Sequence, residues 1–119
     1  MSDDFPFKVE TLLEQCGGSK DVGSIVIDEF LLQVDTDTRE MEACLASGDL
    51  TQAGKVGHRL KGTTGVLGAS KFHSLCFALE IAGRDGDAEA AKNAYRDLKA
   101  EAERCIAAVP QMRSRLENV

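Results

Sequence analysis

The chain has 119 residues, a length that suits one domain and is ample to bury a core. Its formal net charge of −6 argues against nucleic acid as the main partner. The chain has few aromatic residues, no tryptophan and no apolar run approaching the roughly 20 residues that cross a membrane, so composition favours a helical protein outside the membrane. Its acidic N-terminus also lacks the basic and apolar regions of a signal peptide, so we expect a cytoplasmic protein.

The first part of the chain predicts a short helix followed by a long one. Pro6 can occupy the first position of the short helix, and the glycines at 17–18 stop it. Ser19 or Asp21 then begins the long helix, which ends at Gly48. Its apolar residues at helical spacing are Val22, Val26, Phe30, Val34, Met41 and Leu45.

The next part predicts a third and a fourth helix. Asp49 with Gln52 resembles a capping box for the third helix, which carries His58 and ends near Gly68. Ser70 can cap the fourth helix. The inward residues of that helix are Phe72, Leu75, Cys76 and Leu79.

A fifth helix is expected in the last part of the chain. Gly83, Gly86 and Asp87 mark the exit of the fourth helix and the start of the fifth. Pro110 should end or kink the fifth helix, because proline inside a helix costs about 3 kcal/mol. Residues 111–119 fit either a further helical turn or a loose tail. The apolar spacing of the fifth helix comprises Ala91, Ala94, Tyr95, Leu98, Ala102, Cys105, Ile106 and Val109.

Short connections between amphipathic helices imply antiparallel neighbours. The sequence therefore predicts an all-α protein, an antiparallel four-helix bundle with an additional short N-terminal helix that caps one end. We expect residues 1–119 to form a single domain with a core over about 7–108 and a C-terminal extension over 110–119.

His58 lies outside the apolar stripe of the third helix. At about 100° per residue its imidazole is about 140° from the centre of that stripe, so it should point outward or to the flank. Gly54, Gly62 and Gly65 fall on the same flank, although each glycine costs roughly 0.5–1 kcal/mol relative to alanine. Lys61 can reach the same space from position i+3. An exposed ring nitrogen, bare backbone and a nearby ammonium indicate a site with room for a phosphoryl group.

The residues around His58 resemble a known family. They follow the pattern His-x-x-Lys-Gly-x-Thr/Ser-x-x-x-Gly, and an apolar helix ending Cys-x-x-Leu-Glu comes next. This pattern resembles the histidine-containing phosphotransfer (HPt) domain of two-component phosphorelays, and the resemblance runs from about residue 7 to about residue 108. The matching residues are His58, Lys61, Gly62, Thr64, Gly68, Cys76, Leu79 and Glu80.

The resemblance implies a phosphorelay intermediate. His58 would accept a phosphoryl group from the aspartate of one receiver domain and pass it to another, without ATP-dependent kinase activity of the chain itself. Glu80 stands where the family usually carries glutamate or glutamine, so it would hold the second ring nitrogen of His58. Lys61 would face the phosphate, and Gly62 would leave room for the receiver. No cofactor is implied for this chain, because the magnesium ion would belong to the receiver.

Several of these residues also have an ordinary structural explanation. Glu80 could pair with Arg84 at i+4, Lys61 could be a solvated lysine, and Gly62 could be a packing glycine. Thr64 faces inward, so its hydroxyl could bond to the backbone or help to hold the site. Phe77 lies outside the main stripe of its helix, and both a helix contact and an apolar docking patch are open for it.

The segment around His58 is locally basic. No acidic residue occurs from Thr51 to Leu79, whereas Lys55, Arg59, Lys61 and Lys71 all do. Complementary charge would promote encounter with an acidic receiver pocket, and a solvated basic face is the alternative. We therefore group Arg59 with the docking positions Gly54, Gly62, Thr64 and Gly65.

Two other function classes are weighed against phosphotransfer. A helical adaptor could bind receivers without relaying phosphate, but an intact His58 with Lys61 and Gly62 argues against it. A metal or redox bundle lacks ligand spacing, since the cysteines are widely separated and no Glu-x-x-His pair exists. His73 lacks the motif and is expected to be structural or at the surface, and Cys16, Cys44, Cys76 and Cys105 are expected to be buried free thiols. We expect a monomer, either free-standing or cut from a larger hybrid kinase.

Overall fold

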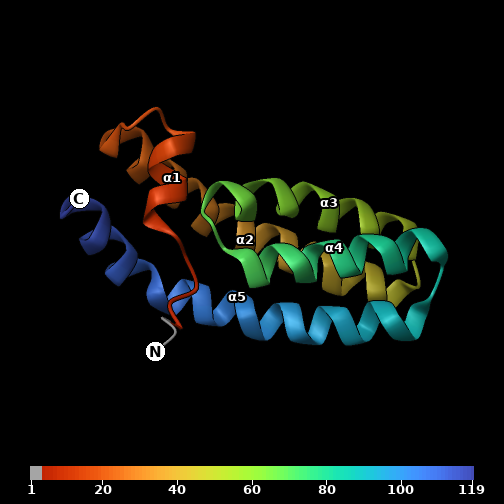
Figure 1. Ribbon diagram of the computed structural model, residues 1–119. Coiled ribbons are helices and arrows are strands. Elements are labelled where there is room, and N and C mark those ends of the chain that lie inside the picture. The colour runs from red at the N-terminus through yellow and green to blue at the C-terminus, as the bar shows by residue number, and fades with distance from the viewer. Residues whose placement is uncertain (1–3) are drawn as a thin grey trace.

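The computed structural model describes residues 4–119, which fold into five helices without a strand. These are α1 (Val9–Gln15), α2 (Lys20–Ser47), α3 (Leu50–Val66), α4 (Ser70–Asp85) and α5 (Ala88–Glu117). Helices α2 to α5 run antiparallel to their chain neighbours, and α1 lies at the end where α2 begins and α5 finishes (Figure 1). The expected all-α bundle with a short N-terminal helix is confirmed. No helix in the described part of the chain is long and apolar enough to span a bilayer.

The bundle has two long helices and two short ones. Helices α2 and α5 have 28 and 30 residues, whereas α3 and α4 have 17 and 16. The long pair therefore extends beyond the α3–α4 hairpin, and α1 covers the exposed end (Figure 1). The ring of Phe30 packs edge-on against Phe7 at 5.9 Å and against Phe72 at 6.2 Å, which joins the N-terminal segment to α2 and α4. Such edge-to-face pairs add to the free energy of burial.

The helix starts follow the sequence signals with three corrections. Ser19 caps α2, and Asp49 caps α3 by accepting a hydrogen bond from the backbone N–H of Gln52. Helix α1 begins at Val9, so Pro6 precedes the helix instead of opening it. Ser70 is the first residue of α4 and not its cap. The N-cap is Ala69, which makes no side-chain hydrogen bond. The Gln52 side chain does not complete a capping box, because it donates to Glu40 on α2.

Helix α5 continues through Pro110 to Glu117, so of the two outcomes expected at Pro110, an end or a kink, the helix does not end there. The chain after Pro110 is a helix and not a loose tail, because Met112 and Leu116 are buried at 0% and 3% exposure. Burying each side chain stabilises the fold by about 1.5–3 kcal/mol, enough to offset the cost of proline. The ribbon changes direction toward its C-terminal end, so the kink is retained (Figure 1).

Helices α3 and α4 approach each other through backbone atoms. A Cβ added at Gly83 would lie 2.6 Å from the carbonyl oxygen of Leu50, and one added at Gly54 would lie 3.3 Å from Cα of Gly83. A Cβ at Gly57 would lie 3.0 Å from the carbonyl oxygen of Cys76. Gly83 is therefore a packing residue inside α4 and not its exit signal. The same contact corrects the expectation that Gly54 provides open clearance beside His58.

Candidate functional site

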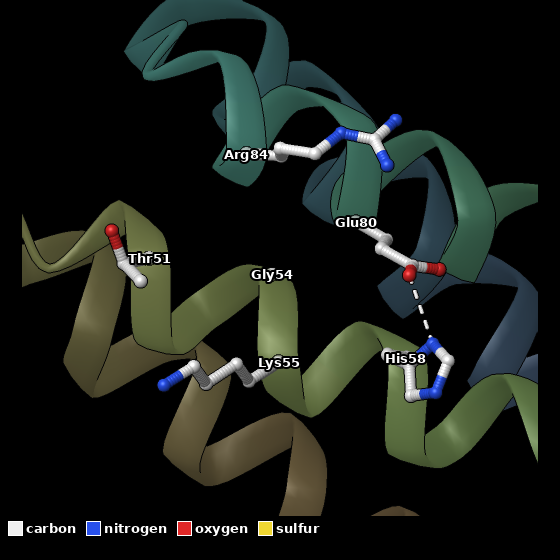
Figure 2. Close-up of a pocket in the computed structure, with 6 residues that line it drawn as sticks. All are labelled: Thr51, Gly54, Lys55, His58, Glu80 and Arg84. Carbon is white, nitrogen blue, oxygen red and sulfur yellow. Dashed lines mark hydrogen bonds and ion pairs between the residues drawn. The ribbon is translucent and has the colours of Figure 1, made fainter.

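His58 is exposed near the middle of α3, as the helical wheel predicts. Its side chain is 66% exposed, and its Nδ1 lies 2.8 Å from Oε2 of Glu80 on α4 (Figure 2). The other ring nitrogen, Nε2, points away from Glu80 (Figure 2). The close backbone approach of α3 and α4 is what brings these two side chains within hydrogen-bond distance.

Glu80 links His58 to Lys61. Its second oxygen, Oε1, lies 2.8 Å from Nζ of Lys61. The hydrogen bond from Lys61, and then that from His58, lowers the pKa of the Glu80 carboxyl. An ionised carboxylate only accepts hydrogen bonds, so Nδ1 of His58 is the donor and carries the ring proton. The Nε2 lone pair is then free. Among residues 4–119 no ion pair joins Glu80 to Arg84, the alternative partner considered from sequence.

Lys61 is held between α3 and α4 instead of projecting freely beside His58. Its side chain is only 22% exposed, and Nζ lies 4.9 Å from the ring centroid of Phe77. The sequence placed Lys61 in the right neighbourhood, but its contact is with Glu80. Of the two possibilities open for Phe77, the structure shows a helix contact, although the residue stays 46% exposed.

The other predicted site residues divide by what surrounds them. Gly62 has nothing within 4 Å of an added Cβ, so the backbone beyond His58 is open. Gly65 faces His73, whose Nδ1 would lie 3.5 Å from such a Cβ. The buried Thr64 hydroxyl donates to the backbone oxygen of Lys61 at 2.9 Å, so it bonds to the backbone of its own helix. Gly62 alone of these glycines has the clearance that the sequence led us to expect.

The Arg59 side chain turns toward α2, where two carboxylates bind it. Its Nη2 lies 2.6 Å from Asp37 and 2.9 Å from Glu40, and Asp37 is buried. Lys71 lies 4.0 Å from the buried carboxylate of Glu101 on α5. The segment that is basic in sequence is therefore largely neutralised by carboxylates from the neighbouring helices. Arg59, which the sequence groups with the docking positions, is thus already paired with two carboxylates of α2.

A hollow of about 410 Å³ opens beside His58, between α3 and α4. Its walls carry two cations, Lys55 and Arg84, and neither makes a hydrogen bond or an ion pair to another side chain in the part of the chain that the structure describes. The complete lining is Thr51, Gly54, Lys55, His58, Glu80 and Arg84 (Figure 2). Sequence reasoning missed Arg84 as a site residue. Its i+4 spacing from Glu80 would have found it, because that spacing places both side chains on one face of α4.

The remaining candidate ligands are structural. His73 is half-buried, and its Nδ1 lies 3.0 Å from the backbone oxygen of Lys61, a contact consistent with the structural or surface position expected for it. Cys44, Cys76 and Cys105 are buried and Cys16 is half-buried, all as free thiols. Residues 4–119 contain no group of three or more His, Cys, Asp or Glu side chains that could hold a metal ion.

Comparison with known proteins identifies the family. The family model for the Hpt domain matches residues 26–118, which is most of the chain, so the chain belongs to the Hpt domain family. This places it among the histidine phosphotransfer proteins of two-component phosphorelays. The crystal structure of histidine-containing phosphotransfer protein B (HptB) from Pseudomonas aeruginosa PAO1 has a similar fold. The two share 24% identity at a TM-score of 0.83, over 95% of this chain and 98% of that one. Comparison with curated proteins gives no significant match.

Proposed function

We propose that His58 is the phosphoryl-accepting residue of this chain and that it relays the group between aspartates of receiver domains. One observation carries this assignment. The His58 imidazole is exposed while its Nδ1 is fixed on the Glu80 carboxylate, so Nε2 is the nitrogen offered to a partner. A nucleophile held by an orienting group is the arrangement that covalent transfer requires.

The transfer step uses two groups of this chain, Nε2 of His58 and the Glu80 carboxylate. The Nε2 lone pair attacks the phosphorus of a receiver's aspartyl phosphate, so an N–P bond forms. The bond from phosphorus to the carboxyl oxygen breaks, and the aspartate leaves as a carboxylate. The ring gains positive charge as the N–P bond forms, and the ionised Glu80 beside Nδ1 stabilises that charge. The reverse sequence delivers the group to a second receiver. The bound phosphoryl group would lie beside the hollow that carries Lys55 and Arg84.

The relay needs a partner that supplies the phosphoryl chemistry. The magnesium ion would be held by the receiver domain, and this chain would have neither a cofactor nor ATP-dependent kinase activity of its own. The open backbone at Gly62 gives the receiver room to bring its aspartate up to His58. We propose that the protein acts as a monomer in the cytoplasm.

Incubation with a phosphorylated receiver tests the assignment. His58→Gln should abolish phosphoryl acceptance and leave thermal stability nearly unchanged, because an exposed side chain contributes little to the core. His73→Gln should still accept the group. Acceptance by the His58→Gln protein would show that another residue is the carrier. Binding of the receiver without any transfer to the wild-type protein would instead indicate a non-relaying adaptor.

A further inference from the structure

Two side chains of α3 and two of α4 form a compact group at the site. His58 and Lys61 are one turn apart on α3, and Phe77 and Glu80 are one turn apart on α4. Glu80 contacts both residues of α3 at 2.8 Å, and the Phe77 ring lies 4.9 Å from the Lys61 ammonium. Lys61 therefore has a carboxylate on one side and an aromatic face on the other.

The Phe77 contact matters because a lysine does not choose one position by itself. Its ammonium ends a flexible four-carbon stem and can donate in three directions. An aromatic face attracts a cation within about 6 Å of its centroid, and it offers no hydrogen bond that would draw the ammonium away from a carboxylate. The ring thus favours the position of Lys61 in which Nζ also reaches Glu80, and in that position the side chain is largely covered, at 22% exposure.

We propose that Phe77 is a positioning residue of the phosphotransfer site, because its ring holds Lys61 against Glu80 and so keeps His58 protonated on Nδ1. Phe77 touches neither the reacting nitrogen nor the phosphoryl group. It acts through Lys61, and Lys61 acts through Glu80. The inference rests on the proposed function only for its effect on transfer; the effect on the His58 tautomer belongs to the unphosphorylated protein.

Support for this order of action comes from the electrostatics of Glu80. The hydrogen bond from Lys61 is the largest cause of the lowered pKa of the Glu80 carboxyl, ahead of that from His58. A displaced Lys61 would leave the carboxylate with one fewer partner and free to rotate about its side chain. The hydrogen bond to Nδ1 would weaken, and the tautomer protonated on Nε2, which cannot attack phosphorus, would gain population.

The experiment measures the imidazole directly and transfer separately. Nitrogen-15 spectra of the histidine rings report which nitrogen carries the proton, and His58→Gln assigns the signals of the two histidines. We would compare the wild type with Phe77→Leu, which removes the ring but keeps an apolar side chain, and with Phe77→Tyr, which keeps the ring. Ile106→Ala is the matched control, since it also trims an exposed apolar residue, 41% exposed, but on α5.

We expect Phe77→Leu to lower the ratio of the Nδ1-protonated to the Nε2-protonated form of His58 by about two- to fivefold. Phosphoryl acceptance should slow by at most that factor, because its rate follows the fraction of His58 protonated on Nδ1, and receiver affinity should stay unchanged. Phe77→Tyr should keep the tautomer ratio and the transfer rate at their wild-type values, and Ile106→Ala should change neither of them. An unchanged tautomer ratio in Phe77→Leu overturns the proposal. If transfer then slows only because the receiver binds more weakly, Phe77 is a docking residue instead. The wild-type protein could fail to accept a phosphoryl group while Phe77→Leu still lowers the tautomer ratio of His58. That result would refute the proposed function and leave this inference standing.

Discussion

The Glu80 carboxylate lies 2.8 Å from the His58 imidazole although the two residues are 22 positions apart in the chain. The contact exists because α3 and α4 run antiparallel and meet through glycine backbone, one turn away at Gly54 and Gly83. The distance between two helices thus decides whether the His58 ring is oriented.

The glycine contact predicts a paired loss of stability and of site geometry. Gly83→Ala would place a Cβ 2.6 Å from the Leu50 carbonyl oxygen, so α4 must move away from α3. We expect unfolding to become easier by about 1–3 kcal/mol and the His58–Glu80 hydrogen bond to lengthen. Thermal unfolding and histidine nitrogen-15 spectra check both effects. Gly62→Ala is the control, since its Cβ meets nothing within 4 Å and helix propensity should stabilise that variant by about 0.5–1 kcal/mol. Equal stability of the two variants would contradict the role given to Gly83.

Gly62→Gln should separate folding from docking. Glutamine is a better helix former than glycine, so thermal stability should hold or rise. The longer side chain would fill the open space one turn beyond His58, and both receiver affinity and transfer rate should fall. Calorimetric titration with a receiver and a transfer assay give the two measurements. Full binding and transfer in a stably folded Gly62→Gln protein would refute the clearance argument.

Arg84 should stabilise the phosphorylated form. It lines the hollow beside His58 without a carboxylate partner in the described residues, so its guanidinium is available to an anion there. We expect Arg84→Gln to slow phosphoryl acceptance and to shorten the lifetime of the phosphorylated protein, each by about two- to fivefold, as for an exposed ion pair. Lys92→Gln removes a charge on α5 and should leave both unchanged. An identical lifetime in the wild type and in Arg84→Gln would show that the hollow does not hold the phosphoryl group.

The cysteines should differ sharply in reactivity. Burial raises the pKa of the Cys76 and Cys105 thiols to about 12. Alkylation requires the thiolate, which for these two residues forms only as the pH approaches that value. At pH near 8 iodoacetamide should therefore modify the half-buried Cys16 first and leave Cys76 and Cys105 unmodified until the protein unfolds. Peptide mass spectrometry gives the order of labelling, and rapid native labelling of Cys76 would contradict the packing around it.

Much of the site follows from helical periodicity. The angle of His58 from the apolar stripe predicts its exposure, and the angle of Glu80 on an antiparallel neighbour predicts that the two can meet. A wheel gives the direction of a side chain but not the distance to the next helix. It therefore could not distinguish Gly54, which packs against α4, from Gly62, which is open. Nor could it choose a partner for Lys61, whose long stem reaches a phosphoryl group or Glu80 equally well from i+3.

The continuation of α5 beyond Pro110 has a different origin. Local propensity argues for a helix end there, but Met112 and Leu116 gain burial only if the helix continues. Tertiary packing overrides a local signal when the buried area is large enough. Likewise, the acids that neutralise Arg59 come from α2, so the sequence around His58 could not reveal them.

The pairing of Arg59 with Asp37 and Glu40 also affects how a partner reaches the site. Charges that are already matched project little field into solvent, so an approaching receiver would be attracted mainly by Lys55 and Arg84. Such weak attraction would be short in range, because at physiological ionic strength it is mostly screened at separations beyond about 8 Å. Recognition would then depend on the fit of surfaces after collision more than on steering before it, and added salt would change the association rate only modestly.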